Sequence, residues 1–554
     1  MLTYKLKSDS LVDYLLDRCV NQIKFSLKVH WLINSYHESE TNPKIAKLFE
    51  NLLQKIEVTL VNGRRCTASN YSQYQMIAKN QTEEIYHQSI EKEIRQIYFD
   101  KCIEFYLKLK EMCEKLKSFP KESDRPNNRN TILKSYIFMF NANIRELKSS
   151  LKLEENFKNS IARNFYKGVI LPFDDSFSTM DEHNSIIVRM LPEHSFCFST
   201  KARVPVKISA ECIRVIECFK WDELYLEVRR RGSLVQQDNI EMMITKLEED
   251  ESSNNRNNTN EDLPLKHTYS QEMTKSLELY MKEIKDNLTD KTQENSNHQV
   301  EEDYSLIDFN SDIVNPFGRI WADACKDIKE TSPFRNFETY SIKNFIAKAD
   351  DDLRQELMTM QLIKKFNEIF QYAEIPLKIK PYEILITSTS SGLIEFLPNT
   401  NSIDGIKKKL PSYWNLNKFF RSFFLDSFEE AQKNFAESLA AYSLLSYFIQ
   451  IKDRHNGNLL IDMKGHLIHI DFGFVLGISP GNLNFESAPF KLTSEYVEIL
   501  DGFDSPIFEY YKSLMLRGMM EAKKHVDSLT KIIEIMSKGR IIIIITNRFE
   551  DALF

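Results

Sequence analysis

The chain has 554 residues, enough for roughly three to four domains, and its 42% hydrophobic and 28% charged residues are ordinary for a globular protein with a large core. Its formal net charge of -7 gives no global indication of a nucleic-acid-binding protein. The cysteines form no Cys-x-x-Cys pair, which argues against a zinc site and favours reduced thiols in a cytosolic protein. The N-terminus is polar rather than signal-like, and no apolar run approaches the roughly 20 residues that span a bilayer, so we expect any membrane contact to be peripheral.

The first part of the chain is predicted to be all-helical, over residues 1–170. Apolar residues recur every four positions and predict one amphipathic helix over about 9–36: Leu11, Leu15, Cys19, Ile23, Leu27 and Trp31. Two further helices are predicted, over about 82–117 and about 131–152. The first of these stops before Pro120.

Strands follow the helices. Short, partly alternating apolar runs predict strands at 185–190, 196–198 and 206–212. Residues 246–303 are so polar that they cannot bury enough apolar surface to offset the entropy of ordering. We predict a disordered insertion there, with one short helix near 273–288.

A further predicted strand, 342–348, ends in Lys348, and the acidic segment after it opens a helix with aspartates at its positive end. A compact ammonium suits a point contact with phosphate, and Glu356 could keep it aimed. Taken alone, the segment is equally well a solvated lysine beside capping aspartates. Similarly, the stretch 331–336 could present hydroxyl and N–H groups to phosphates or form a plain Ser-Pro turn.

Two strands, 382–387 and 392–397, are predicted next, and then a helix over 434–451 with one apolar side. This helix leads into the hexapeptide Asp-Arg-His-Asn-Gly-Asn at 453–458. The residues after it read as a β-hairpin that turns at 464–465 and leads to Asp-Phe-Gly at 471–473.

The two motifs together indicate a kinase. An aspartate with an asparagine five positions later, followed by Asp-Phe-Gly, is how kinases hold a hydroxyl nucleophile and the magnesium ions of ATP. The hairpin would bring Asn458 and Asp471 together as oxygen ligands. Protein kinases write His-Arg-Asp where this chain has Asp-Arg-His, which favours a lipid kinase. Between residues 471 and 493 the only basic residue is Lys491, which argues against a substrate with extra phosphates.

These stretches resemble the type III beta phosphatidylinositol 4-kinases, within the phosphatidylinositol 3-/4-kinase superfamily. The segment around Lys348 resembles the family signature K-x-G-D-D-L-R-Q-[DE], with Asp350 standing where members usually have glycine. The resemblance implies an α+β fold in which the helical domain precedes a two-lobed lipid kinase. The β-rich N-lobe would cover 185–398, and the mainly helical C-lobe would cover 399–554, with a shortened C-terminus.

The resemblance also implies roles for residues. Asp453 and His455 would flank the attacking hydroxyl, with His455 as proton acceptor, and Lys348 would complete the catalytic set. ATP would be bound by Ser332, Pro333, Phe334, Lys348, Glu356, Tyr382, Glu395, Phe396, Leu397 and Ile470. Asn458 and Asp471 would hold the metal, and Phe472, Gly473 and Lys491 would belong to the activation loop that meets the substrate.

The implied function is transfer of the γ-phosphate of ATP, with Mg²⁺ or Mn²⁺, to the 4-hydroxyl of phosphatidylinositol. The enzyme would be a cytoplasmic monomer, peripheral on Golgi or other intracellular membranes, which binds a Rab-family GTPase through its helical domain and binds no nucleic acid. Apolar side chains of the loop 474–490 are expected to enter the membrane surface: Leu476, Ile478, Leu483 and Phe485. Three alternatives stay open: a phosphatidylinositol 3-kinase, a protein kinase of the same superfamily, and a catalytically weak scaffold that recruits small GTPases.

Overall fold

The computed structural model describes residues 9–20, 22–62, 83–119, 128–145, 168–173, 184–198, 203–215, 315–477 and 488–536. All of them belong to one compact unit, Met1–Leu224 with Ile307–Phe554. Several predictions fall outside the described residues. These are the insertion 246–303 with its short helix, the apolar loop residues Ile478, Leu483 and Phe485, and the shortened C-terminus beyond residue 536. Leu476 of the same loop is described and only 3% exposed, so it packs in the core instead of reaching the membrane surface as predicted.

The helix predicted over about 9–36 is wrong as a single element, because the structure has two helices there, α2 (Asp9–Cys19) and α3 (Ile23–Glu38). Gln22, between them, leaves the helical region with φ -132° and ψ 84°. The hydroxyl of Ser26 donates to the carbonyl of Cys19 at 3.2 Å, which satisfies the last turn of α2. The four-residue apolar spacing runs across the break, so periodicity could not reveal it.

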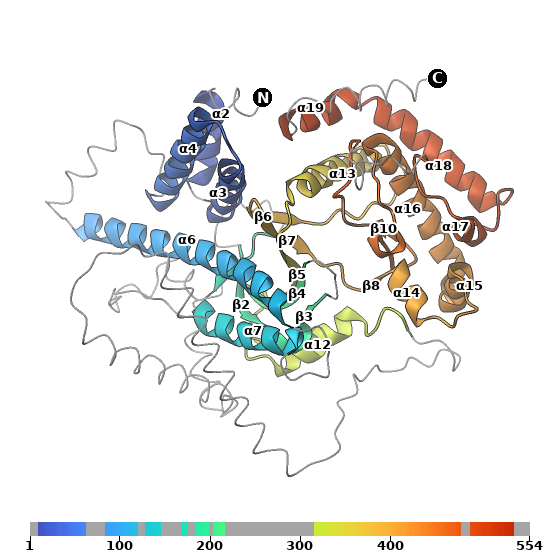
Figure 1. The fold of residues 1–554 in the computed structure, drawn as a ribbon, viewed down its shortest axis with the longest axis horizontal. Helices are drawn as coiled ribbons and strands as arrows, with labels where there is room; N and C mark the ends of the chain where they lie inside the picture. Colours follow the sequence, from blue (N-terminus) through green and yellow to red (C-terminus); the bar gives the residue numbers. More distant parts are fainter. Residues whose placement is uncertain are drawn as a thin grey trace, which may run out of the picture. The chain divides into compact units, whose positions relative to one another are not determined.

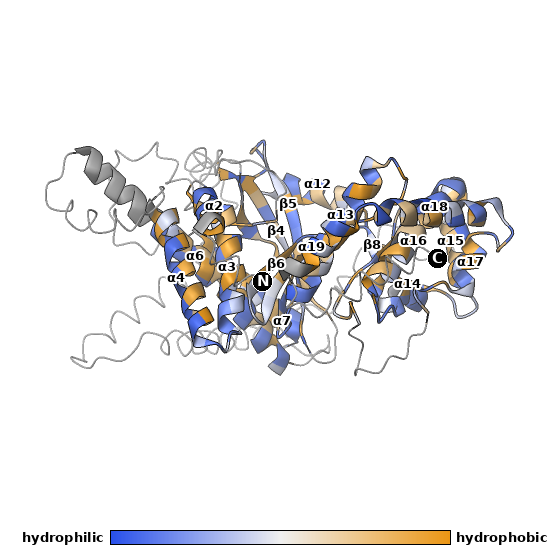
Figure 2. Cartoon of the chain, turned by 90° about the horizontal axis from the view of Figure 1, so that it is seen from above, coloured by the Kyte–Doolittle hydropathy of each residue, from blue (hydrophilic) through white to orange (hydrophobic). Residues whose placement is uncertain are grey.

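A third helix, α4 (Pro43–Asn62), was not predicted and packs with α2 and α3. Their shared core consists of Leu16, Cys19, Ile33, Phe49, Leu52 and Ile56. Figure 2 shows hydrophobic and hydrophilic residues side by side on α3 and α4, as expected for helices with one buried face.

The long helix α6 (Glu83–Lys115) confirms the helix predicted to end before Pro120, and it continues into a 3₁₀ turn, η1 (Leu116–Ser118). Helix α7 (Arg129–Arg145) confirms the start of the third predicted helix. Both lie against the large sheet (Figure 1). The Tyr106 hydroxyl of α6 donates to the carbonyl of Ile170 at 2.5 Å, and the Asn141 amide of α7 donates to the carbonyl of Met190 at 2.8 Å.

The large sheet is antiparallel with strand order β1-β2-β4-β5-β7-β6, and β3 pairs with β4. Its strands are β1 (Val169–Ile170), β2 (Ser185–Met190), β3 (Phe196–Cys197), β4 (Val206–Arg214), β5 (Ser341–Ala349), β6 (Ile384–Ser388) and β7 (Ser391–Glu395). The predicted strands are confirmed within one to two residues at most ends. Strand β1 was not predicted and falls inside the range 1–170 that we expected to be all-helical.

Around the sheet and after it, helices dominate. They are α12 (Trp321–Thr331), α13 (Arg354–Tyr372), α14 (Ile403–Lys409), α15 (Leu416–Phe423), α16 (Phe428–Ile449), α17 (Ser494–Ile499), α18 (Pro506–Lys523) and α19 (Val526–Met536), with 3₁₀ turns η4 (Pro192–His194), η6 (Leu425–Ser427) and η7 (Asn456–Asn458). Helix α16 begins six residues before the predicted start and lies beside α18 (Figure 1). The fold is therefore α+β, as predicted. In the described part of the chain, no helix combines the length and the apolar character needed to cross a membrane.

A second, three-stranded antiparallel sheet contains the hairpin that links the Asp-Arg-His-Asn-Gly-Asn and Asp-Phe-Gly motifs. It consists of β8 (Thr400–Ser402), β9 (Leu459–Asp462) and β10 (Leu467–His469) in the order β10-β9-β8. Gly465 sits at the turn with φ 86°, a left-handed conformation that glycine adopts without strain. The predicted hairpin is thus confirmed, and it ends two residues before Asp471.

Candidate active site

Lys348 and Glu356 form an ion pair between strand β5 and the first turn of α13. The Lys348 ammonium lies 3.7 Å from a carboxylate oxygen of Glu356 and 3.6 Å from one of Asp351. Burial by itself lowers the pKa of Lys348, but the carboxylates of Glu356, Asp471 and Asp351 outweigh it and raise the pKa. Lys348 therefore stays a cation at neutral pH, and Asp471 of the Asp-Phe-Gly motif belongs to its surroundings.

Tyr382 contacts the Glu356 side chain of this pair. Its hydroxyl donates to Glu356 at 2.7 Å, and its ring stacks on that of Phe472, with centroids 6.3 Å apart. Tyr382 is only 2% exposed. These contacts favour a role in holding Glu356 over the direct ATP contact that we predicted for Tyr382.

Asp350 adopts the left-handed conformation, with φ 55°. Glycine adopts this backbone conformation without strain, which explains why the signature usually has glycine at this position. Aspartate is among the few other residues that tolerate the conformation. The Asp350 carboxylate forms an ion pair with Lys117, at the end of η1. The helical region therefore contacts the turn directly after Lys348.

The catalytic-loop motif is built around Asn458, which lies in η7. Its side-chain amide donates to the carbonyl of Asp453 at 3.0 Å, and its backbone carbonyl accepts from the N–H of Ile470 at 3.1 Å. The second bond ties the loop to the residue before Asp471. The structure thus brings Asn458 next to the Asp-Phe-Gly motif, as the hairpin predicted.

Asp453 and His455 lie near each other at the surface of this loop. The His455 Nε2 is 4.0 Å from a carboxylate oxygen of Asp453, too far for a hydrogen bond, and its Nδ1 accepts from the N–H of Gly457 at 3.0 Å. A neutral imidazole that accepts at Nδ1 carries its proton on Nε2. In this tautomer, His455 presents a donor rather than an acceptor toward Asp453.

Arg454, between these two residues, makes several structural hydrogen bonds that we did not predict. Its guanidinium donates to the carbonyls of Lys452 at 2.9 Å and Ile470 at 2.7 Å, and also to that of Asp471. It lies 5.4 Å from the centroid of the Phe472 ring. Arg454 therefore fastens the catalytic loop to the Asp-Phe-Gly motif. The only available signal was its place inside a motif, because its partners are backbone carbonyls.

Two further residues, Gln355 and Lys491, make hydrogen bonds within the site. Gln355, beside Glu356, donates to the carbonyl of Gly473 at 2.7 Å. Lys491 donates to the carbonyl of Arg454 at 2.8 Å and to the Asn456 side chain at 3.1 Å. The structure therefore places Lys491 on the catalytic loop. Its predicted contact with substrate would be made from that position.

The predicted phosphate loop is packed rather than open. Ser332 and Phe334 are buried, and the Ser332 hydroxyl accepts from the N–H of Phe334 at 3.0 Å, while Pro333 between them is half-buried. These groups are used within the loop itself, so a contact with phosphates would require them to exchange partners. Their role in ATP binding stays a prediction.

The predicted hinge follows β7. The N–H groups of Glu395 and Phe396 donate to the carbonyls of Glu383 at 2.8 Å and Asn344 at 3.1 Å, so both serve the sheet. Adenine recognition would then rely on the other polar backbone groups of the hinge, including those of Leu397. Ile470 packs against the hydrophobic core that contains the Leu397 side chain. This assignment also stays a prediction.

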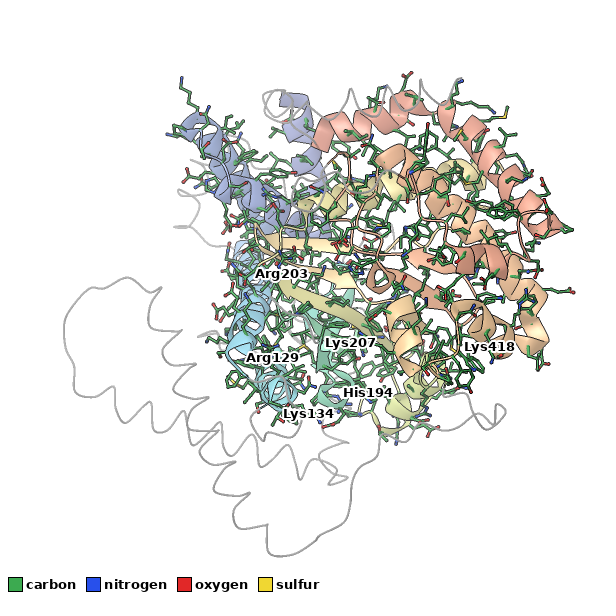
Figure 3. The ribbon with its side chains drawn as sticks, turned by 45° about the vertical axis from the view of Figure 1, so that its right-hand side comes forward. Arg129, Lys134, His194, Arg203, Lys207 and Lys418 are labelled. Atoms are coloured by element: carbon green, nitrogen blue, oxygen red, sulfur yellow. The ribbon has the colours of Figure 1, made fainter. Side chains whose placement is uncertain are left out.

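A second buried lysine, Lys207 on β4, was missed because it lies in an ordinary strand pattern (Figure 3). It pairs with Ile346 of β5, so it shares a sheet face with Lys348. Its ammonium donates to the carbonyl of His194 at 2.6 Å and lies 5.1 Å from the Trp321 ring and 5.5 Å from the Phe396 ring. Burial lowers the pKa of Lys207 to about 8.

Comparison with known proteins shows which family part of the chain resembles. Residues 342–544, which hold the Lys348 segment, the catalytic loop and the Asp-Phe-Gly motif, match the family model for phosphatidylinositol 3- and 4-kinase. This part of the chain is therefore similar to phosphatidylinositol 3- and 4-kinases.

The kinase domain is similar to curated relatives. It is 47% identical over 238 residues to phosphatidylinositol 4-kinase of Dictyostelium discoideum, covering 42% of this chain and 20% of that protein. It is 45% identical over 223 residues to phosphatidylinositol 4-kinase beta of Homo sapiens, covering 40% of this chain and 27% of that protein. It is 46% identical over 226 residues to phosphatidylinositol 4-kinase beta 2 of Arabidopsis thaliana, covering 40% of this chain and 20% of that protein. The chain thus matches about a fifth to a quarter of the length of these relatives.

Proposed function

We propose that the chain is a phosphatidylinositol 4-kinase, which transfers the γ-phosphate of ATP to the 4-hydroxyl of phosphatidylinositol. One observation carries the proposal. The pair of Lys348 on β5 with Glu356 on α13 meets the Asp-Phe-Gly motif, because Asp471 interacts electrostatically with Lys348 and Gln355 is hydrogen-bonded to Gly473. Kinases use such a meeting of a phosphate-binding lysine with the Asp-Phe-Gly aspartate to place ATP for in-line transfer.

The nucleophile would be activated at the catalytic loop. We place Asp453 and His455 beside the attacking hydroxyl, with His455 as proton acceptor. For His455 to accept a proton at Nε2, the proton there must first move, for example when Gly457 releases Nδ1. Hydrogen bonds in the absence of substrate often differ from those of the reacting complex, so this rearrangement is compatible with the role.

The metal site would consist of Asn458 and Asp471. The Asn458 amide nitrogen donates to Asp453, which leaves its oxygen as the coordinating atom, and Asp471 supplies a carboxylate. Two hard oxygen ligands suit Mg²⁺, which takes its remaining ligands from ATP phosphates and water, and Mn²⁺ would fit the same donors. When bound, the ion neutralises charge on the transferring phosphoryl group. Asp471→Asn should abolish turnover while leaving thermal stability nearly unchanged, and a normal response of its turnover to Mg²⁺ titration would contradict this site.

Substrate choice rests on charge and on the relatives. The activation loop lacks the clustered basic residues that extra inositol phosphates would require, which favours unphosphorylated phosphatidylinositol. The choice of the 4-hydroxyl is supported by the relatives, which are named phosphatidylinositol 4-kinases.

Further parts of the proposal come from the resemblance to the type III beta family. They are peripheral association with Golgi or other intracellular membranes, a Rab-family GTPase as partner of the helical domain, and a monomeric state. The division into a helical domain at 1–170, an N-lobe at 185–398 and a C-lobe at 399–554 also remains a proposal. The strand β1 suggests that the N-lobe sheet extends slightly into the first range.

A lipid-kinase assay tests the function. The full chain would be incubated with ATP, Mg²⁺ and vesicles containing phosphatidylinositol, and the product would be separated by the position of its phosphate. We expect phosphatidylinositol 4-phosphate. Formation of the 3-phosphate would establish the 3-kinase alternative, and turnover of a protein substrate alone would establish the protein-kinase alternative. No turnover with intact ATP binding would favour the scaffold.

A further inference from the structure

The C-terminal end of α3 contacts the segment that links Lys348 to Glu356. Arg354 is the first residue of α13, two positions before Glu356. Its guanidinium donates to the carbonyl of Ser35 at 3.1 Å and to the hydroxyl of Ser39 at 2.7 Å. The last carbonyls of a helix lack partners within it and carry partial negative charge, so a cation suits this position.

The other edge of the same guanidinium binds the linking segment. The Arg354 Nε and Nη2 donate to the carboxylate of Asp352, at 2.9 and 2.6 Å. The guanidinium carbon lies 5.2 Å from the centroid of the Tyr36 ring of α3. Arg354 is thus held simultaneously by a carboxylate, a helix end and an aromatic ring. The compact ammonium of a lysine could not reproduce this set of contacts.

A second contact reaches the segment independently. Glu38, the last residue of α3, accepts from the N–H and the hydroxyl of Thr389, both at 3.0 Å. The carbonyl of the next residue, Ser390, accepts from the N–H of Asp351 at 3.0 Å. Asp351 is the second carboxylate near the Lys348 ammonium. The end of α3 therefore fixes both ends of the segment 351–354.

We infer that Arg354 is a positioning residue for the Lys348–Glu356 pair. By binding the end of α3, Arg354 holds the first turn of α13 in place. The consequence for ATP rests on the proposed function, in which this pair binds the nucleotide phosphates. Because Glu356 lies on the first turn of α13, a displaced helix start moves its carboxylate. Misplacement by about 1 Å can cost on the order of 100-fold in an enzyme reaction.

The test uses variants on both sides of the contact, in the full chain. Tyr36→Leu combined with Ser39→Ala removes the α3 side chains and leaves the kinase motifs intact, while Arg354→Met removes the guanidinium and Arg354→Lys keeps only its charge. Arg421→Met is a matched control. The Arg421 guanidinium also pairs with an aspartate, Asp501, and lies 4.6 Å from the centroid of the Phe428 ring, but it belongs to α15.

Two quantities are measured: the Kd of ATP with Mg²⁺, and amide hydrogen exchange in the first turn of α13. We expect the α3 double variant and Arg354→Met to weaken ATP binding about tenfold and to speed exchange in this turn, with Arg354→Lys in between and Arg421→Met like the wild type. Unchanged exchange and Kd in the α3 variant would overturn the inference, as would an equal effect of Arg421→Met. If the wild type binds no ATP, the proposed function fails, and hydrogen exchange alone decides whether α3 positions α13.

Discussion

Three aspartates of the site hold left-handed backbone conformations: Asp350, Asp453 and Asp471, with φ of 55°, 60° and 59°. Such residues cost on the order of 1 kcal/mol or more each, and they persist where the surrounding contacts fix them. The Asn458 amide bonds to the carbonyl of Asp453, and the Arg454 guanidinium bonds to the carbonyl of Asp471. Five further described residues also have positive φ, so the conformation accompanies the proposed chemistry without being confined to it: Glu374, Asn399, Gln450, Leu476 and Asp501.

Asp350 allows the strain to be measured. We expect Asp350→Ala to lower the free energy of unfolding by about 1 kcal/mol, because alanine lacks the tolerance of aspartate for positive φ and the pair with Lys117 is lost. Asp350→Gly removes the strain together with the ion pair, so its change should stay below about 1 kcal/mol. Urea unfolding of both variants measures the difference. An alanine variant as stable as the glycine variant would show that the turn is not strained.

The proposed base and its neighbour are tested by substitution. Asp453→Ala and His455→Ala should each lower lipid-kinase turnover by about 10²–10⁴-fold, the usual contribution of a positioned base. Both side chains are partly exposed, at 35% for Asp453 and 60% for His455, so folding should survive. Thermal unfolding of each variant provides the control. Near-normal turnover in a folded variant would remove that residue from the mechanism.

At the scale of elements, strands and motifs could be predicted from the sequence more accurately than contacts between residues that are distant in the chain. Strands β2, β4 and β5 and the β9–β10 hairpin follow from apolar alternation and a Lys-Gly turn, which are local properties. The break between α2 and α3 was hidden because the apolar spacing continues across it. The contacts of Arg354 with Ser35 and of Tyr382 with Glu356 join residues distant in the chain, and no local pattern reports such partners.

Helix α3 also contains a histidine whose charge state should affect stability. Burial lowers the pKa of His30 to about 4, and its ring meets that of Phe99 edge-on at 5.1 Å. Between pH 6.5 and 4 the unfolded chain therefore binds a proton that the folded chain does not, so stability falls as pH falls through this window. The full effect is on the order of 3 kcal/mol at about 1.4 kcal/mol per pH unit.

The comparison of the wild type with His30→Leu isolates this term, since other groups titrate in both proteins. The stability of the wild type relative to the variant should decrease steadily from pH 6.5 to 4 and stay constant above pH 7. Midpoints of chemical unfolding across this range provide the measurement. Parallel pH profiles would mean that His30 takes up its proton in the folded state as readily as in the unfolded one.

At the scale of the whole molecule, buried contacts join the helical region to the large sheet. Tyr106 of α6 is 1% exposed, donates its hydroxyl to Ile170 of β1 and lies 5.0 Å from the Trp31 ring of α3. Asn141 of α7 bonds to Met190 of β2, Lys117 pairs with Asp350 directly after β5, and Arg354 of α13 bonds to Ser35 of α3. A protein whose helical domain was a separate unit would concentrate its contacts within each part. These bonds instead predict that both parts unfold together.

Tyr106→Ala tests this cooperativity. Removing a large buried ring costs about 3–5 kcal/mol, and here it removes contacts with α3 and β1 at once. Under the proposed function, ATP with Mg²⁺ raises the unfolding temperature of the kinase domain, because a ligand that binds only the folded state stabilises it. We expect calorimetry to show that Tyr106→Ala lowers the midpoint of this same ATP-shifted transition. A separate transition that responds to Tyr106→Ala but not to ATP would instead show that the helices unfold independently of the kinase domain.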